Sequence, residues 1–205
     1  MHNDNVHEAE IKFMVSDLAA MAKRLEIAGA RLQQSRTHEL NLRFDTPTKK
    51  LTSAFQVLRL RQDKKVHLTY KGPADLTSEV SVRPEIEFEV ESLPSARRFL
   101  EALGYQVVIT YEKYRTTYLL DQSEIVLDEM PYGNFIEIES PDSETIRVTA
   151  DRLGLKWENR IKLSYLVIFN MLKEKFQFSA DDLLFKELKD RNFSTHQLFQ
   201  EGLID

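Results

Sequence analysis

The sequence predicts an α+β fold dominated by antiparallel β-strands. Segments that alternate apolar and polar residues outnumber the segments with helical spacing. Several of the alternating segments are joined by only three or four residues, which is enough for a hairpin and too short for a parallel crossover. With 205 residues, of which 42% are hydrophobic, the chain is long enough to bury a core.

Eight segments have the period of two that is typical of β-strands, in which residues two apart point to the same side. They comprise residues 7–13, 39–45, 55–61, 66–71, 85–91, 107–119, 125–130 and 134–139. The short connections at 62–65 and 131–133 predict tight hairpins between consecutive strands.

Four segments place apolar residues three and four positions apart, as an amphipathic helix does. They comprise residues 16–29, 95–103, 143–153 and 161–176. Ser16 is a candidate N-cap of the first helix, and Gly29, Gly104 and Gly154 follow the first three as stop signals.

The sequence predicts one main domain, residues 1–177, followed by a helical C-terminal extension, residues 178–205. No linker rich in Pro, Gly or Ser and no repeat divides the main domain. In the extension, residues 179–191 have early acids and late bases, which is typical of a helix.

The composition excludes several classes of function. Lys and Arg total 28 against 33 Asp and Glu, so the net charge of −5 gives no general basic field for nucleic acid. The absence of Cys excludes disulfides, zinc–thiolate sites and thiol catalysis. The sequence shows no signal peptide and no apolar run near the ~18 residues of a membrane span. We therefore expect a cytoplasmic protein that binds neither nucleic acid nor membrane.

The polar faces of the predicted strands carry many full charges. Solvated sheet faces are often charged, but same-sign pairs two residues apart, such as Arg59 with Arg61, have no structural use on a surface. If the apolar faces pack outward against helices, the charged faces line a closed barrel, which also removes exposed sheet edges. The sequence thus predicts a charged tunnel. Its lining would comprise the bases Lys12, Arg43, Arg59, Arg61, Lys71, Lys113 and Arg115, and the acids Glu8, Glu10, Glu85, Glu87, Glu89, Asp128, Glu137 and Glu139.

Such a lining suits a polyphosphate bound together with a metal ion. Two carboxylates at positions i and i+2, as in the pairs Glu8/Glu10 and Glu137/Glu139, can converge on Mg²⁺ or Mn²⁺, which prefer oxygen ligands. Arg side chains can grip two phosphate oxygens at once, and Lys supplies a point charge. A metal-bridged polyphosphate would explain why both signs of charge share one cavity.

In these motifs the sequence resembles the CYTH superfamily, the triphosphate tunnel metalloenzymes, over roughly residues 6–172. The closest resemblance is to the branch of class IV adenylyl cyclases and thiamine triphosphatases. The motifs, in the family's order, are Glu-x-Glu-x-Lys at 8–12, Arg-Phe-Asp-Thr at 43–46, Leu-Arg-Leu-Arg at 58–61, Leu-Thr-Tyr-Lys-Gly-Pro at 68–73, Arg-Pro-Glu-Ile-Glu at 83–87, Lys-x-Arg at 113–115, Leu-Asp-Glu at 127–129 and a closing Glu-Ile-Glu at 137–139.

The resemblance implies a role for each matching residue. The implied metal ligands, for Mg²⁺ or Mn²⁺, are Glu8, Glu10, Glu137 and Glu139. Asp128 is either a further ligand or a group that orients the attacking water or the ribose hydroxyl. The implied triphosphate clamp is Lys12, Arg59, Arg61, Lys71, Lys113 and Arg115, with Lys12, Lys113, Arg115 and Asp128 acting at the reacting phosphate. Supporting roles fall to Arg43, Arg83, Glu85, Glu87 and Glu89, of which the three glutamates serve either a second metal or ion pairs with the clamp.

Two catalytic hypotheses remain open at this point. A triphosphatase directs water to the terminal phosphorus, whereas a class IV adenylyl cyclase directs the ribose 3′-hydroxyl to the α-phosphorus and releases pyrophosphate. We favour the triphosphatase because the sequence contains no motif that reads a base. A non-catalytic polyphosphate-binding module is the third alternative. The expected partner is tripolyphosphate, ATP or thiamine triphosphate, and the sequence leaves a homodimer open.

Overall fold

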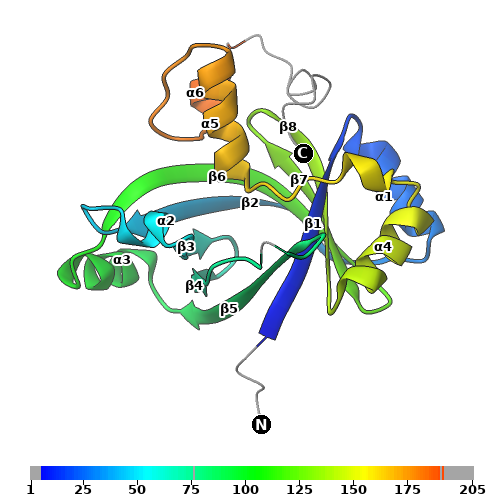
Figure 1. Ribbon diagram of the computed structural model, residues 1–205, viewed down its shortest axis with the longest axis horizontal. Helices are drawn as coiled ribbons and strands as arrows, with labels where there is room; N and C mark the ends of the chain where they lie inside the picture. Colours follow the sequence, from blue (N-terminus) through cyan, green and yellow to red (C-terminus); the bar gives the residue numbers. More distant parts are fainter. Residues whose placement is uncertain (1–5, 76, 190, 192–205) are drawn as a thin grey trace.

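The computed structural model describes residues 6–75, 77–189 and 191, with side chains from residue 9 onward, and within this part an antiparallel sheet of eight strands closes into a barrel (Figure 1). The strand order around the barrel is β1-β5-β4-β3-β2-β6-β7-β8, and every neighbouring pair is antiparallel. The strands are β1 (Val6–Val15), β2 (Arg31–Asp45), β3 (Val57–Gln62), β4 (Val66–Lys71), β5 (Ser81–Val90), β6 (Gln106–Leu120), β7 (Ser123–Met130) and β8 (Gly133–Ser140). The predicted α+β barrel is confirmed.

The helices lie outside the barrel. They are α1 (Leu18–Ile27), α2 (Lys50–Ser53), α3 (Leu93–Ala102), α4 (Ser143–Arg152), the 3₁₀ turn η1 (Trp157–Asn159), α5 (Tyr165–Lys175) and α6 (Phe185–Leu188). In Figure 1, α1 and α4 flank one side of the sheet, α2 and α3 lie at the opposite side, and α5 and α6 stand above one end. No helix in the described ranges is long and apolar enough to cross a membrane.

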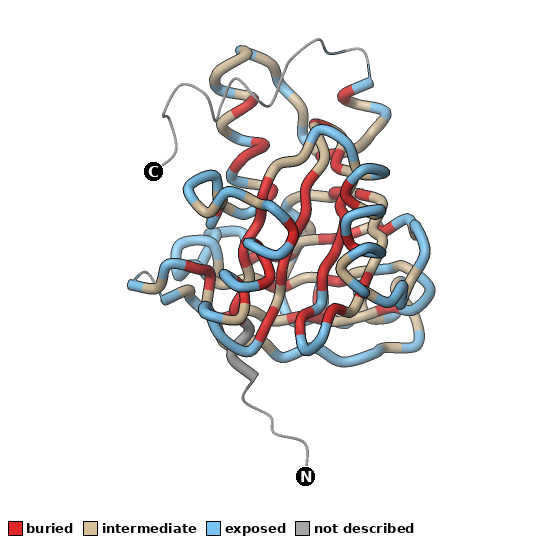
Figure 2. The backbone as a smooth tube through the Cα atoms, turned by 90° about the vertical axis from the view of Figure 1, so that its right-hand side faces the viewer, coloured by how far each residue is buried: buried red, intermediate tan, exposed pale blue. Residues whose placement is uncertain are grey.

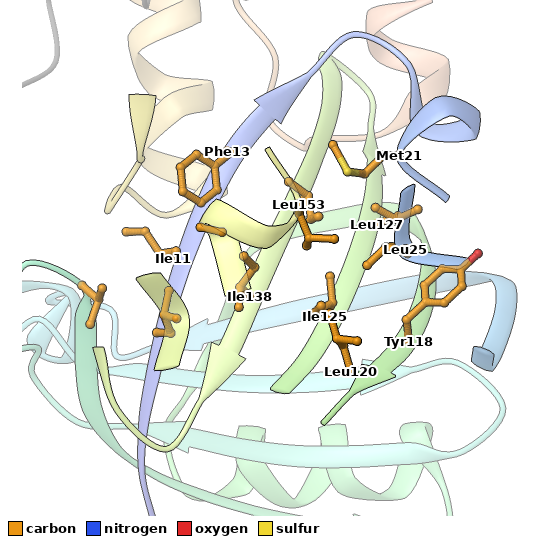
Figure 3. Close-up of a cluster of buried hydrophobic side chains, with 14 of the residues drawn as sticks. Ile11, Phe13, Met21, Leu25, Tyr118, Leu120, Ile125, Leu127, Ile138 and Leu153 are labelled. Carbon is orange, nitrogen blue, oxygen red and sulfur yellow. The ribbon is translucent and has the colours of Figure 1, made fainter. Parts of the chain in front are cut away.

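The core lies between the outer face of the sheet and these helices. Ile11 of β1 and Ile138 of β8 are fully buried against Leu25 of α1 and Ile146 of α4 (Figure 3). A second cluster packs Phe135 against α5, and a third packs α3 on β3. Figure 2 shows buried residues running along the strands and exposed residues gathered in turns and on outer helix faces. Because the apolar faces point outward, the charged faces must point into the barrel.

Several element boundaries differ from the sequence prediction. Strand β2 begins at Arg31 because its first half pairs with β6, although that half is mostly exposed and therefore shows no apolar alternation. The short helix α2 was not expected, and the buried Asp45 carboxylate caps it by accepting the backbone N–H groups of Leu51 and Thr52. Asp17, rather than Ser16, is the N-cap of α1.

The C-terminal elements also differ. Helix α5 begins at Tyr165, after the N-cap Ser164, rather than at residue 161. Within residues 179–191 the helix is limited to α6, because the preceding residues pair with β6: Leu183 bridges Tyr111, and Asp182 Oδ1 accepts the N–H of Thr110 at 2.7 Å. The rest of the predicted extension, residues 192–205, lies outside the described residues.

Candidate functional site

A charged cavity of about 400 Å³ occupies the interior of the barrel. Inward-facing side chains from all eight strands line it, because the period of two places the charged positions of each strand on one side. The sequence-predicted residues that line it are Glu10, Lys12, Arg43, Arg59, Arg61, Lys71, Arg83, Glu85, Glu87, Lys113, Arg115, Glu137 and Glu139.

Three other predicted residues have different positions. Asp128 is fully buried behind the cavity wall, where it contacts Lys113 and Arg115. Glu89 lies outside the lining, with a half-exposed side chain that pairs with Lys65. The backbone of Glu8 pairs with Arg83 between β1 and β5, but its side chain lies outside the described residues.

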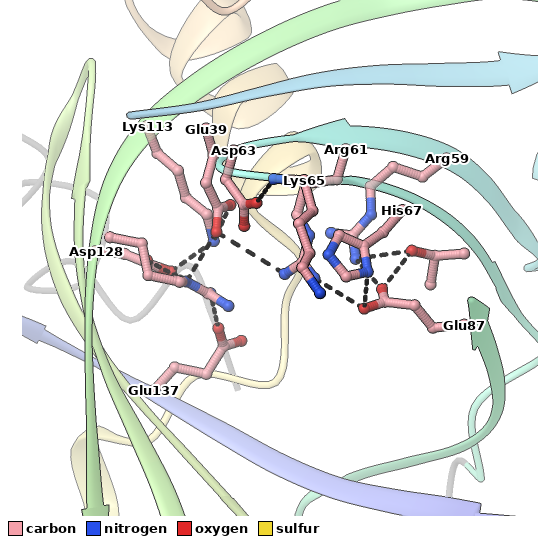
Figure 4. A network of polar contacts seen from close by, with 12 residues as sticks. Glu39, Arg59, Arg61, Asp63, Lys65, His67, Glu87, Lys113, Asp128 and Glu137 are labelled. Atoms are coloured by element: carbon pink, nitrogen blue, oxygen red, sulfur yellow. Dashed lines mark hydrogen bonds and ion pairs between the residues drawn. The ribbon is translucent and has the colours of Figure 1, made fainter. Parts of the chain in front are cut away.

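Asp128 organises two of the predicted clamp residues. Its Oδ2 accepts a hydrogen bond from Lys113 Nζ at 2.8 Å (Figure 4). Oδ2 also accepts one from Arg115 Nη2 at 2.7 Å, and Oδ1 accepts one from Arg115 Nε at 2.8 Å. Burial alone would raise the pKa of Asp128, but the charges of Arg115 and Lys113 outweigh burial and lower it. The carboxylate is therefore ionised, and the two bases are held in fixed positions.

Lys12 of β1 is also held by carboxylates. Its Nζ lies 2.6 Å from Glu137 Oε1 and 3.1 Å from Glu10 Oε1. Burial lowers the pKa of Lys12, but the two carboxylates raise it by more, so the net shift is upward and the ammonium group stays charged. The strand register produces this arrangement, because Lys12 of β1 lies opposite Glu137 of β8.

The acids of β5 pair with bases of the predicted clamp. Glu87 lies 2.8 Å from Arg61 Nη2 and accepts a hydrogen bond from Thr69 Oγ1 at 2.6 Å (Figure 4). Glu85 pairs with Lys71. This geometry matches the ion-pairing alternative for these glutamates.

The structure adds a buried carboxylate that was not a sequence candidate. Glu39 of β2 is 1% exposed; its Oε1 lies 3.8 Å from both Arg61 Nη1 and Arg115 Nε, and its Oε2 lies 3.6 Å from Lys113 Nζ. Burial raises the pKa of Glu39, but the charges of Lys113 and Arg115 lower it by more, so the net shift is downward and the carboxylate remains ionised. The alternation of residues 39–45, which places Glu39 on the same face as Arg43, was the signal that could have identified it.

Two cavity-lining tyrosines were also not identified from sequence. The hydroxyl of Tyr111 accepts a hydrogen bond from Arg59 Nη1 at 3.3 Å, and Tyr165 enters the site from the start of α5. The strand pattern could have placed Tyr111, which lies two residues before Lys113. It could not have placed Tyr165, because that residue belongs to a helix outside the barrel.

A row of carboxylates crosses three neighbouring strands. In the strand register, Glu139 of β8 lies opposite Glu10 of β1 on one side and Glu124 of β7 on the other. Burial raises the pKa of Glu139 to about 7; Lys71 acts in the opposite direction, and the neighbouring carboxylates Glu124, Glu10 and Glu137 add to the increase. Like charges at paired positions repel, so this row destabilises the metal-free protein.

The chemistry of this donor set fits a divalent cation. Carboxylate oxygens are the ligands that Mg²⁺ and Mn²⁺ prefer, and a bound cation would offset the repulsion. Among the side chains that the structure describes, no three His, Asp or Glu residues already stand close enough together to hold a metal ion. Glu10 and Glu139 occupy directly paired positions on β1 and β8, so their carboxylate oxygens are the first candidates for metal ligands.

Comparisons with known proteins agree with this architecture. A family model for the CYTH domain matches residues 6–164. The PH1012 protein from Pyrococcus horikoshii is 27% identical, with a TM-score of 0.67 over 78% of this chain and 98% of that chain. A Vibrio parahaemolyticus protein is 22% identical, with a TM-score of 0.71 over 80% and 98% of the two chains. HpAC1 from Hippeastrum, a protein with a dominant triphosphatase activity, is 20% identical, with a TM-score of 0.59 over 80% and 95%.

A comparison with curated proteins found no match. The CYTH model nevertheless spans well over half of the sequence, and the matched region contains the complete barrel with its charged interior. On these grounds the chain belongs to the CYTH domain family.

Proposed function

We propose that this protein is a divalent-metal-dependent phosphohydrolase that acts on inorganic tripolyphosphate or a small organic triphosphate. One observation carries the proposal: the described lining of the barrel cavity contains nine basic and six acidic side chains. The bases are far more numerous than one phosphate group needs, and the acids on the neighbouring strands β1 and β8 supply oxygens that suit a metal.

The bases would bind the phosphate chain directly. Arg59 and Arg83 each have a buried Nε without a hydrogen-bond partner, and Arg43 makes no ion pair among the described residues, so these guanidinium groups retain donors for anionic oxygens. Lys12, Lys113 and Arg115 are held at fixed positions by Glu137 and Asp128. Such preorganised charges stabilise negative charge on a phosphoryl group without rearrangement during the reaction.

The residues that would hold the metal are Glu10, Glu137 and Glu139, together with Glu8 as the resemblance implies. A bound divalent cation would neutralise phosphate charge and orient the attacking water. Asp128 accepts hydrogen bonds from Lys113, Arg115 and Tyr165, which favours a role in holding these residues over direct metal ligation.

Hydrolysis is favoured over cyclisation because the cavity shows no group that would read a nucleotide base. Within the described lining, the aromatic rings are those of Tyr111 and Tyr165, and both hydroxyls already bond to charged residues of the wall. The triphosphatase activity of the Hippeastrum protein, which has the same fold, accords with this proposal.

Product analysis by phosphorus NMR tests the proposal. The purified chain is incubated with tripolyphosphate and separately with ATP, each with Mg²⁺, with Mn²⁺ and with EDTA. We expect metal-dependent release of orthophosphate from tripolyphosphate, and the same activity in the control variant Glu89→Gln, because Glu89 lies outside the cavity lining. Cyclic AMP with pyrophosphate would overturn the proposal in favour of a cyclase. Tight binding of tripolyphosphate without turnover would overturn it in favour of a binding module.

A further inference from the structure

Tyr165 joins helix α5 to the interior of the barrel. The backbone before α5 is fixed to β1 at Lys12, where Lys12 and Ile161 exchange two hydrogen bonds of 3.3 and 2.8 Å. Ser164 then caps α5 by accepting the N–H of Val167. The hydroxyl of Tyr132 also donates to the carbonyl oxygen of Tyr165 at 2.9 Å. These contacts direct the largely buried Tyr165 side chain into the cavity wall.

The side chain of Tyr165 contacts three residues that the resemblance assigns to the reacting phosphate. Its hydroxyl donates to Asp128 Oδ2 at 2.8 Å. Its ring centroid lies 5.3 Å from Lys12 Nζ and 5.3 Å from Lys113 Nζ, within the range of a cation–π contact. The ring therefore contacts two cations, one from β1 and one from β6.

The hydrogen bond from Tyr165 is one of four that Asp128 accepts. Oδ2 accepts from Lys113, Arg115 and Tyr165, and Oδ1 accepts from Arg115. Tyr165 is the neutral donor of this set. Without it, Asp128 could rotate toward its charged partners, and Lys113 and Arg115 would then shift with it.

We propose that Tyr165 is a positioning residue that fixes Asp128, and through it Lys113 and Arg115, against the bound triphosphate. The inference rests on the proposed function. Under this proposal, the first residue of α5 belongs to the site, although the rest of this helix packs outside the barrel.

The test compares Tyr165→Phe with Tyr118→Phe in the full chain. Each variant removes one hydroxyl from a buried tyrosine, but Tyr165 donates to Asp128, whereas Tyr118 packs in the apolar cluster outside the barrel with Leu25 and Ile125. A hydrogen bond to a charged group corresponds to a change of about 10- to 100-fold in kcat/KM. We expect Tyr165→Phe to lower kcat/KM for tripolyphosphate by this factor, and Tyr118→Phe to change it less than about threefold.

A third variant separates the ring from the hydroxyl. Tyr165→Leu also removes the cation–π contacts with Lys12 and Lys113, so we expect a further rise in KM beyond that of Tyr165→Phe. Calorimetric binding of tripolyphosphate in EDTA gives a readout that needs no turnover, and circular dichroism confirms that each variant is folded. We expect tripolyphosphate to bind Tyr165→Phe at least about threefold more weakly than it binds Tyr118→Phe.

Equal kcat/KM and equal binding in Tyr165→Phe and Tyr118→Phe would overturn the inference. A lower Tm of Tyr165→Phe with unchanged kinetics and binding would also overturn it. If the unmodified protein binds tripolyphosphate but does not hydrolyse it, the proposed hydrolysis fails, and the binding comparison alone decides the role of Tyr165. If it neither binds nor hydrolyses tripolyphosphate, both the proposed function and this inference fail.

Discussion

Replacing Glu139 by glutamine should stabilise the metal-free protein at alkaline pH. Glu139 lies in register between Glu10 and Glu124, and it makes no ion pair with any residue that the structure describes. Burial, opposed by Lys71 and reinforced by the neighbouring carboxylates, raises its pKa from 4.5 to about 7. The charge that suits this residue to a cation therefore destabilises the fold when no cation is bound.

The pKa values set both the sign and the size of the effect. Between pH 4.5 and about 7 the folded chain keeps a proton on Glu139 that the unfolded chain has released, so the free energy of unfolding falls as pH rises through this window. A difference of about 2.5 pKa units corresponds to roughly 3 kcal/mol, which is fully expressed above pH 7. A neutral glutamine avoids this penalty, and a domain of this size should gain roughly 6–12 °C in Tm.

The assay is urea denaturation in EDTA at about pH 5 and pH 8.5, with the exposed Glu89→Gln as the matched control. For each variant the assay gives the free energy of unfolding relative to the unmodified protein. For Glu139→Gln this difference should be roughly 2–3 kcal/mol larger at pH 8.5 than at pH 5. For Glu89→Gln it should stay within about 0.5 kcal/mol at both pH values. If Glu139→Gln shows the same stability difference at both pH values, or loses stability at pH 8.5, the reasoning about this carboxylate is refuted.

Three other substitutions test separate parts of the molecule. Glu10→Gln should raise the Mg²⁺ concentration needed for half-maximal activity by about tenfold or more, and an unchanged metal titration would contradict the metal assignment. Arg59→Ala should weaken tripolyphosphate binding by about tenfold in calorimetry, while a fall in Tm as large as that of a core truncation would indicate a structural role. Ile138→Ala, at a fully buried position, should lower the free energy of unfolding by about 2–5 kcal/mol in urea, whereas Ile86→Ala on the exposed outer face of β5 should change it by less than about 1 kcal/mol.

The fold class and most of the cavity lining could be predicted from the sequence because both depend on a local property. The period of two along a strand decides which residues share a face, so Arg59 and Arg61, or Glu137 and Glu139, were assigned to one surface without a structure. Where the alternation is weak the prediction fell short, as in the exposed first half of β2. A segment whose two faces are both charged, or both exposed, shows no alternation of apolar and polar residues.

What the sequence determined by itself was therefore the composition of the tunnel: its residue types, their alternation and the mixture of bases with paired acids. The tertiary structure decided which of these charges meet. Glu39 approaches Lys113 and Arg115 only through the pairing of β2 with β6, and Tyr165 reaches Asp128 only because α5 is fixed beside Lys12. Strand register and barrel closure bring together residues far apart in the chain, and no local pattern specifies these contacts.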